Sequence, residues 1–128
     1  MITNRASGRS AVDKSVLLGN LGGDHELLLE IFGIFAKQNG PMLAAVRDAA
    51  KRKDAAALEH SAHALKGTVG VFGARAAVEA SQKLELMGRN RDLTNAEDVC
   101  GLLDSELARL GAELAELEQS LRAERRRG

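Results

Sequence analysis

The last part of the chain carries apolar residues at helical spacing from residue 99 to residue 121. This stripe consists of Val99, Leu103, Leu107, Leu110, Leu114, Leu117 and Leu121. Spacings of three and four residues place such side chains on one face of an α-helix. A stripe of this kind also occurs in coiled-coil dimers. We favour a core-facing helix of a bundle, which is the commoner explanation.

Three aspartates precede further helical segments and can cap them. Asp13 opens a short helix that we expect to end near Gly19, and Asp24 and Asp54 open two longer ones. Pro41 should kink or split the helix after Asp24, because proline lacks a backbone donor. Lys51–Lys53 suit the C-terminal end of that helix. Its apolar face consists of Leu28, Ile31, Phe32, Phe35, Met42 and Val46.

Gly73 marks the end of the helix that follows Asp54. A further helix is predicted over 74–87 and should stop at Gly88. Thr94 and Glu97 have the spacing of a capping box for the last helix. No segment shows the alternation of a strand. The sequence therefore predicts an all-α fold, an antiparallel up-down four-helix bundle with a short additional N-terminal helix.

The helical pattern divides the chain into three parts. Residues 1–12 are rich in Ser, Arg and Gly and are expected to form a flexible tail or linker. Residues 13–121 should form the bundle. Residues 122–128 are a charged tail that we expect to fray.

Composition excludes several classes of function. The net charge is +0 and the chain has no Trp or Tyr, which disfavours nucleic-acid binding. The apolar stretch 27–36 is short and contains Glu30, so we expect no membrane insertion. Cys100 is the single cysteine and cannot form an internal disulfide, which fits a reducing, cytoplasmic location.

The segment around His63 combines features that a plain core helix does not need. Gly67 and Gly70 follow His63 within a helix, where each glycine costs about 1 kcal/mol relative to alanine. At about 100° per residue, Gly67 lies roughly 40° from His63 around the axis, Gly70 roughly 20° and Lys66 roughly 60°. His63 points away from the core stripe of Leu58, Ala62, Leu65, Val69 and Phe72. One exposed imidazole should therefore lie over bare backbone, with an ammonium group within reach.

An exposed neutral imidazole is a competent nucleophile near neutral pH. The alternative is a surface histidine beside incidental glycines, with Lys66 as an ordinary solvated lysine. His60 precedes His63 by one turn, but two histidines supply only two ligands and zinc needs more, so no metal site is expected. The chain also lacks a phosphate-binding Gly-rich loop and a magnesium-binding carboxylate set. We therefore expect no kinase activity of its own.

Residues 62–67, Ala-His-Ala-Leu-Lys-Gly, followed by Phe-Gly-Ala at 72–74, resemble the signature of histidine-containing phosphotransfer (HPt) domains. The resemblance covers roughly 13–121. It is supported by Gly23-Asp24, Glu26-Leu27, Phe35, Asp54, Leu84-Glu85 and Gly88-Arg89. Two positions differ from the usual pattern: Val69 is bulkier than the usual small residue, and Ser81 stands where cysteine is common. Both are expected to be packing differences.

The resemblance implies a four-helix phosphorelay module whose histidine carries a phosphoryl group between aspartates of two receiver domains. His63 would be phosphorylated, Lys66 would stabilise the phosphoryl oxygens, and Gly67 and Gly70 would give the incoming aspartyl phosphate room. Glu85, Arg89 and His60 would be supporting or partner-binding residues.

The resemblance also implies a monomer without a cofactor of its own, with magnesium supplied by the receiver, either free-standing or as a module of a hybrid histidine kinase. Two other hypotheses stay open. The chain could be the histidine-phosphorylated input module of a chemotaxis-type kinase, or a helical docking module that carries no phosphate.

Overall fold

The computed structural model describes residues 10–127, except for the side chains of Arg125 and Arg127, and all regular structure in this range is helical. The five helices are α2 (Lys14–Leu21), α3 (His25–Arg52), α4 (Ala55–Gly70), α5 (Arg75–Asn90) and α6 (Ala96–Arg127). The prediction of an all-α fold is confirmed.

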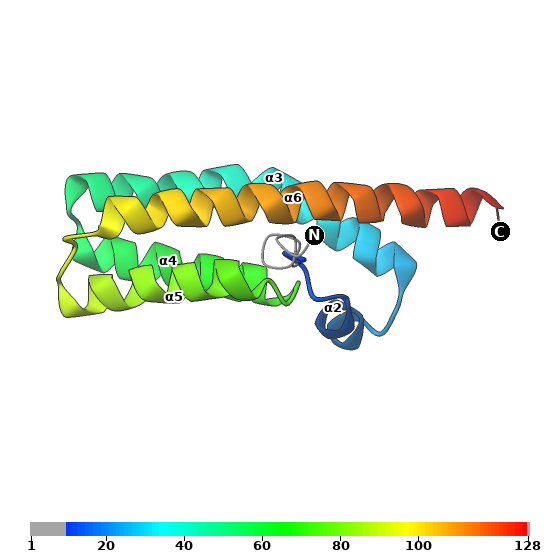
Figure 1. Cartoon of the computed structure of the whole chain (residues 1–128), viewed down its shortest axis with the longest axis horizontal. Coiled ribbons are helices and arrows are strands. Elements are labelled where there is room, and N and C mark those ends of the chain that lie inside the picture. The colour runs from blue at the N-terminus through cyan, green and yellow to red at the C-terminus, as the bar shows by residue number, and fades with distance from the viewer. Residues whose placement is uncertain (1–9, 128) are drawn as a thin grey trace, which may run out of the picture.

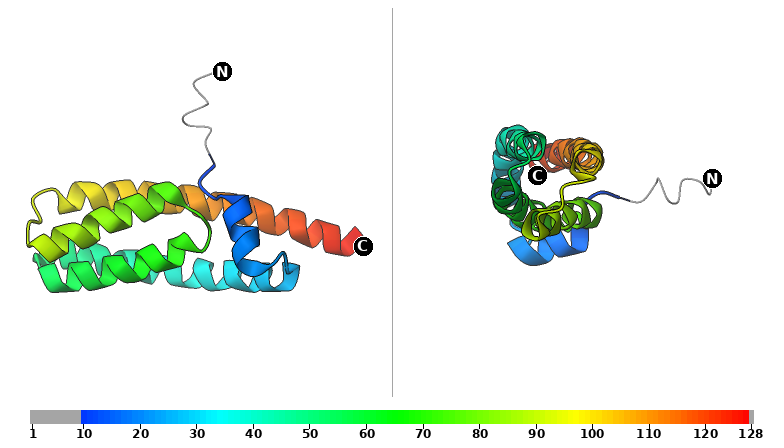
Figure 2. Two further views of the ribbon diagram at one scale, coloured as in Figure 1. Left: turned by 90° about the horizontal axis from the view of Figure 1, so that it is seen from below. Right: turned by 90° about the vertical axis from the view of Figure 1, so that its left-hand side faces the viewer.

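The two long helices, α3 and α6, run the length of the molecule, whereas α4 and α5 occupy only one half of it (Figure 1). The short helix α2 lies across the other half. Seen end-on, α3, α4, α5 and α6 stand at the corners of a square (Figure 2). Successive helices run in opposite directions, so the four-helix bundle with a short N-terminal helix is confirmed. Helix α4 packs against α3 and α5, which leaves its outer face uncovered.

Apolar stripes from every helix form one continuous core. Leu58 and Leu65 of α4 and Leu84 of α5 are completely buried, as the helical spacing predicts. Phe72 follows α4 and packs against Phe32 and Phe35 of α3, with ring centroids 6.2 and 5.2 Å apart. The leucine stripe of α6 faces this core, so it serves the bundle and not a coiled coil between chains.

All three predicted aspartate caps are formed. The Asp13 carboxylate accepts the N–H groups of Ser15 and Val16, and the Asp24 carboxylate accepts those of Glu26 and Leu27. The Asp54 carboxylate accepts the N–H of Ala57. These bonds satisfy backbone donors that the first helical turn leaves free, which explains where α2, α3 and α4 begin.

Several predicted helix ends differ from the structure. α2 continues past Gly19 to Leu21, and Gly22 ends it with φ 66°. α3 runs through Pro41 as one unsplit helix. α5 continues past Gly88 to Asn90, and Arg91 ends it in a left-handed conformation. A helical glycine is therefore not always a stop signal; Gly88 has a packing role described below.

The predicted capping box at the start of α6 is wrong. α6 begins at Ala96, one residue later than a Thr94 cap requires. The hydroxyl of Thr94 donates to the carboxylate of Asp92 at 2.7 Å. The nearby aspartate competes for the hydroxyl, and this local bond forms a turn in place of the box.

The N-terminal end of the described range is tied into the fold. Residues 1–9 of the expected tail lie outside the described residues, but Ala11 and Val12 are buried. Glu113 of α6 accepts the N–H groups of both, at 2.7–3.1 Å. At the other end α6 continues to Arg127. Within residues 10–127, no helix is both long enough and apolar enough to cross a bilayer.

Candidate functional site

His63 lies on the uncovered face of α4. Its side chain is 68% exposed, whereas Ala62 and Leu65 on either side of it in sequence are completely buried. This difference follows from helical geometry, because a residue about 200° from Leu65 must point away from the core. The structure therefore places His63 where an outside molecule can reach it.

A carboxylate from the neighbouring helix holds the His63 ring. Oε2 of Glu85, on α5, lies 2.9 Å from Nδ1 of His63. Lys66 Nζ lies 2.7 Å from the other oxygen, Oε1, and Arg89 donates to Oε2 at 3.1 Å. The structure thus joins four of the residues singled out in the sequence, with Glu85 at the centre.

Glu85 stays ionised in this setting. Its side chain is only 6% exposed. The contact with the Lys66 ammonium is the largest influence and lowers the pKa of Glu85; burial opposes it, and the bond from His63 lowers the pKa further. An ionised carboxylate can only accept hydrogen bonds. The proton of the neutral His63 ring is therefore on Nδ1, and Nε2 carries the free lone pair.

The surface of α4 beside His63 is open at two glycines. An added Cβ at Gly67 or at Gly70 would meet no heavy atom within 4 Å. No neighbouring group in residues 10–127 therefore requires glycine at either position. Both glycines lie on the same strip of α4 as His63, so the missing side chains leave room for a molecule that approaches the imidazole.

Gly88 explains how Glu85 comes so close to α4. A Cβ at Gly88 would lie 2.6 Å from both the carbonyl oxygen of Ala55 and the backbone nitrogen of Glu59. The two helices can approach to this distance only because Gly88 has no side chain. The sequence indicated this glycine as a helix stop and as part of the family resemblance. Its packing role had no sequence signal, because it depends on a neighbour about thirty residues away.

On its α3 side, the site borders the side chain of Met42. Thr68 of α4 contacts Met42 of α3, whose sulfur accepts from the Thr68 hydroxyl at 3.8 Å. Ile34, 45% exposed, lies on this flank of α3, about 80° from Met42 around the axis. The opposite flank of α3 faces α6, where Arg47 pairs with Asp104. The strip around His63 thus borders Met42 on α3 and the charged Arg89 on α5.

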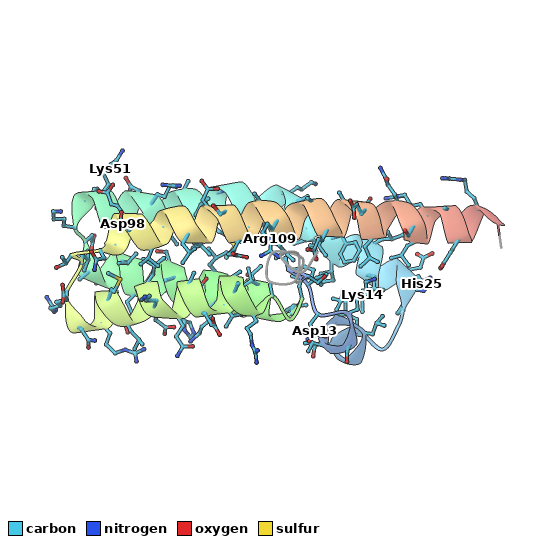
Figure 3. All side chains as sticks on the ribbon, viewed as in Figure 1. Asp13, Lys14, His25, Lys51, Asp98 and Arg109 are labelled. Carbon is cyan, nitrogen blue, oxygen red and sulfur yellow. The ribbon has the colours of Figure 1, made fainter. Side chains whose placement is uncertain are left out.

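The remaining candidates lie apart from the Glu85 cluster. His60 is exposed one turn before His63 and makes no hydrogen bond or ion pair within the described part of the chain. The third histidine, His25, was not a candidate; it begins α3 at the far end of the molecule (Figure 3). Residues 10–127 contain no group of three His, Cys, Asp or Glu side chains that could hold a metal ion.

Comparisons with known proteins identify a family and a similar fold. The family model "Hpt domain" matches residues 30–120. The crystal structure of histidine-containing phosphotransfer protein B (HptB) from Pseudomonas aeruginosa PAO1 is similar, with a TM-score of 0.80 and 23% sequence identity. The match covers 86% of this chain and 96% of that protein. No curated protein matches the sequence.

Proposed function

Because this chain belongs to the Hpt domain family, whose members carry out phosphotransfer in phosphorelays, we propose that His63 is the residue that carries the phosphoryl group. The observation that supports this assignment most strongly is the Glu85 contact. It leaves Nε2 as the free nitrogen on an exposed ring beside two open glycines. Nε2 would accept the group from the aspartyl phosphate of one receiver domain and pass it to the aspartate of another.

Transfer to His63 would be an in-line displacement. The Nε2 lone pair attacks phosphorus, and the bond between phosphorus and the partner's carboxylate oxygen breaks. Magnesium, which neutralises charge in this step, would come from the acidic site of the receiver. Lys66 is 29% exposed, and its ammonium contacts the Glu85 carboxylate that also holds the His63 ring. Its ammonium is a point charge, which can stabilise the phosphoryl oxygens without the two fixed hydrogen bonds that an arginine would make.

The docking surface would be the uncovered face of α4 with its two borders. The receiver must bring a recessed aspartate against Nε2, and the space beside Gly67 and Gly70 permits this approach. The α3 border with Ile34 and Met42 offers apolar contacts, and Arg89 on α5 offers charge. An apolar patch with a polar rim suits a small, transient interface. We also propose that the protein acts as a monomer in the cytoplasm.

Two variants and two donors test the proposal. His63→Gln removes the nucleophile and should abolish acid-labile labelling, while His25→Gln, at the far end of the molecule (Figure 3), should be labelled as the wild type is. The donors are a phosphorylated receiver domain and, separately, a histidine kinase core with ATP. Labelling by the receiver supports a relay role. Labelling by the kinase core alone would instead indicate a kinase input module, and normal signalling by His63→Gln would indicate docking alone.

A further inference from the structure

The contact between His63 and Glu85 has a consequence for the phosphorylated state. A neutral imidazole carries one proton, and here it is on Nδ1, 2.9 Å from an ionised carboxylate oxygen. We propose that Glu85 keeps this proton on Nδ1 throughout the transfer cycle, and that it thereby makes the phosphoryl group on Nε2 labile. Glu85 is a positioning residue in this role, and the inference rests on the proposed phosphorylation of His63.

The electron and proton balance shows why the proton matters. When the Nε2–phosphorus bond forms, the electron pair of the breaking phosphorus–oxygen bond leaves with the aspartate carboxylate. The ring becomes a phosphoimidazolium, with its Nδ1 proton still donated to Glu85. When the group moves on, the nitrogen–phosphorus bond breaks and its electron pair returns to Nε2. The ring is then neutral again, and no proton has moved in either direction.

Loss of the Nδ1 proton would give a different species. Nδ1 would then present a lone pair to the Glu85 carboxylate at hydrogen-bond distance, where the two acceptors repel each other. A neutral phosphoimidazole must also release its phosphoryl group by expelling an imidazole anion, which is a poor leaving group. Glu85 therefore favours the form of the ring from which the phosphoryl group departs easily.

The other charged groups around the ring act through Glu85 or lie further out. Lys66 and Arg89 are cations, but both contact the Glu85 carboxylate itself, at 2.7 and 3.1 Å. Glu59 pairs with Arg89 at 3.1 Å, and His60 is exposed. From α3, the uncharged Met42 contacts Thr68, and the exposed Asp48 and Arg52 pair with each other at 2.8 Å. Glu85 is therefore the anion in direct contact with the ring, and the two cations are linked to the ring through it.

The test needs no partner protein. Phosphoramidate, a small-molecule donor, is used to phosphorylate the wild type and the Glu85→Gln variant. The loss of phosphohistidine is then followed by phosphorus NMR as a function of pH. The phosphoimidazolium, which loses its phosphoryl group quickly, should persist to a pH about one unit higher in the wild type than in Glu85→Gln. At mildly alkaline pH the phosphohistidine of the variant should therefore live about tenfold longer. Glu59→Gln is the matched control, because Glu59 contacts Arg89 and not His63, and its profile should equal that of the wild type.

A second measurement is made on the unphosphorylated wild type. NMR of the ring nitrogens should show the Nδ1–H tautomer of His63, and an Nε2–H tautomer would overturn the inference even if Glu85→Gln failed to fold. Identical pH profiles in the wild type and Glu85→Gln would also overturn it. If phosphoramidate labels His63 with the expected profile but no receiver does, the proposed relay function fails while the role of Glu85 stands.

Discussion

Gly67 and Gly88 are both glycines within helices of the same pair, yet their surroundings are opposite. A Cβ at Gly88 would meet the backbone of α4 at 2.6 Å, whereas a Cβ at Gly67 would meet nothing within 4 Å. Gly88 lets two helices of this chain approach each other. Gly67 leaves a space that nothing in the described chain fills. The fold explains Gly88, and for Gly67 we propose that the space gives access to a partner.

The side of α4 that packs against α5, called here the closed side, and the exposed side that carries His63, called the open side, depend on each other. Gly88 brings α5 against α4, and the residue three positions before it, Glu85, thereby reaches His63 and Lys66. The orientation of the imidazole on the open side thus follows from close packing on the closed side. Substitutions at the two kinds of glycine should separate stability from phosphotransfer.

The largest expected effect on stability is that of Gly88→Ala. The new methyl group would meet backbone atoms, which cannot rotate away, so α4 and α5 must separate. We expect a loss of about 2–3 kcal/mol in the free energy of unfolding, although alanine is the better helix former. Urea denaturation measures the change.

Gly111→Ala in α6 is the control for this substitution. A Cβ at Gly111 meets nothing within 4 Å, so alanine should stabilise the protein by about 0.5–1 kcal/mol. Equal stabilities of the Gly88→Ala and Gly111→Ala variants would show that the helices do not need the close approach.

Gly67→Leu should have the next largest effect, and this effect is on phosphotransfer. The Cβ would meet no neighbouring atom within 4 Å and leucine is a better helix former than glycine, so the fold should be retained while the side chain fills the space beside His63. We expect transfer from a phosphorylated receiver to slow by at least about tenfold, which corresponds to about 1.4 kcal/mol of activation free energy.

Phosphorylation by phosphoramidate provides the control for Gly67→Leu. This donor is small enough to reach Nε2 past the leucine, so its rate should stay near that of the wild type. A receiver rate that also stays unchanged would contradict the steric role of Gly67.

Much of the fold could be predicted because its signals are local. An aspartate followed by apolar residues at helical spacing was enough to place the starts of α2, α3 and α4. Signals that depend on distant partners were missed. Ala11 and Val12 looked like part of a tail, but Glu113, about a hundred residues later, accepts their N–H groups. No local pattern contains that information.

The site shows the same difference between local sequence signals and contacts that depend on distant residues. The exposure of His63 and the shared strip with Gly67 and Gly70 followed from helical periodicity alone. The sequence offered Glu85 only as a supporting or partner-binding residue. Its burial and its contact with Nδ1 depend on how closely α5 packs against α4. That distance is set by Gly88, and only the structure shows it.

A smaller effect should appear in acid, on the closed side of α4. Contacts with Lys66 and His63 lower the pKa of Glu85, so the folded state binds its proton less tightly than the unfolded chain does. The stabilisation is complete above the unfolded carboxyl value of about 4.3 and is lost as the pH falls through the lower folded value. Glu85→Gln should therefore weaken the acid dependence of the free energy of unfolding, measured by urea denaturation at several pH values.

Glu113 offers a comparison away from the site. Burial raises its pKa, but the N–H groups of Ala11 and Val12 and the hydroxyl of Ser10 outweigh burial, so the net pKa is lowered. Glu113→Gln should weaken the acid dependence in the same direction, without changing phosphotransfer. If Glu85→Gln left the acid dependence as it is in the wild type, the three contacts of Glu85 would contribute little to folding.

The smallest expected effect is that of Gly70→Ala, which tests how far the open strip extends. Gly70 is the last residue of α4 and lies about 20° from His63 around the axis, two turns along. A methyl group there meets nothing in the described chain, so alanine should stabilise the fold by about 0.5 kcal/mol. If the receiver covers the strip to the end of α4, transfer should slow by about two- to threefold, less than 1 kcal/mol of activation free energy.

Gly111→Ala, with a comparable gain in stability, should transfer normally. Normal transfer by Gly70→Ala as well would place the edge of the interface between Gly67 and Gly70, and the second open glycine would then need an explanation other than access.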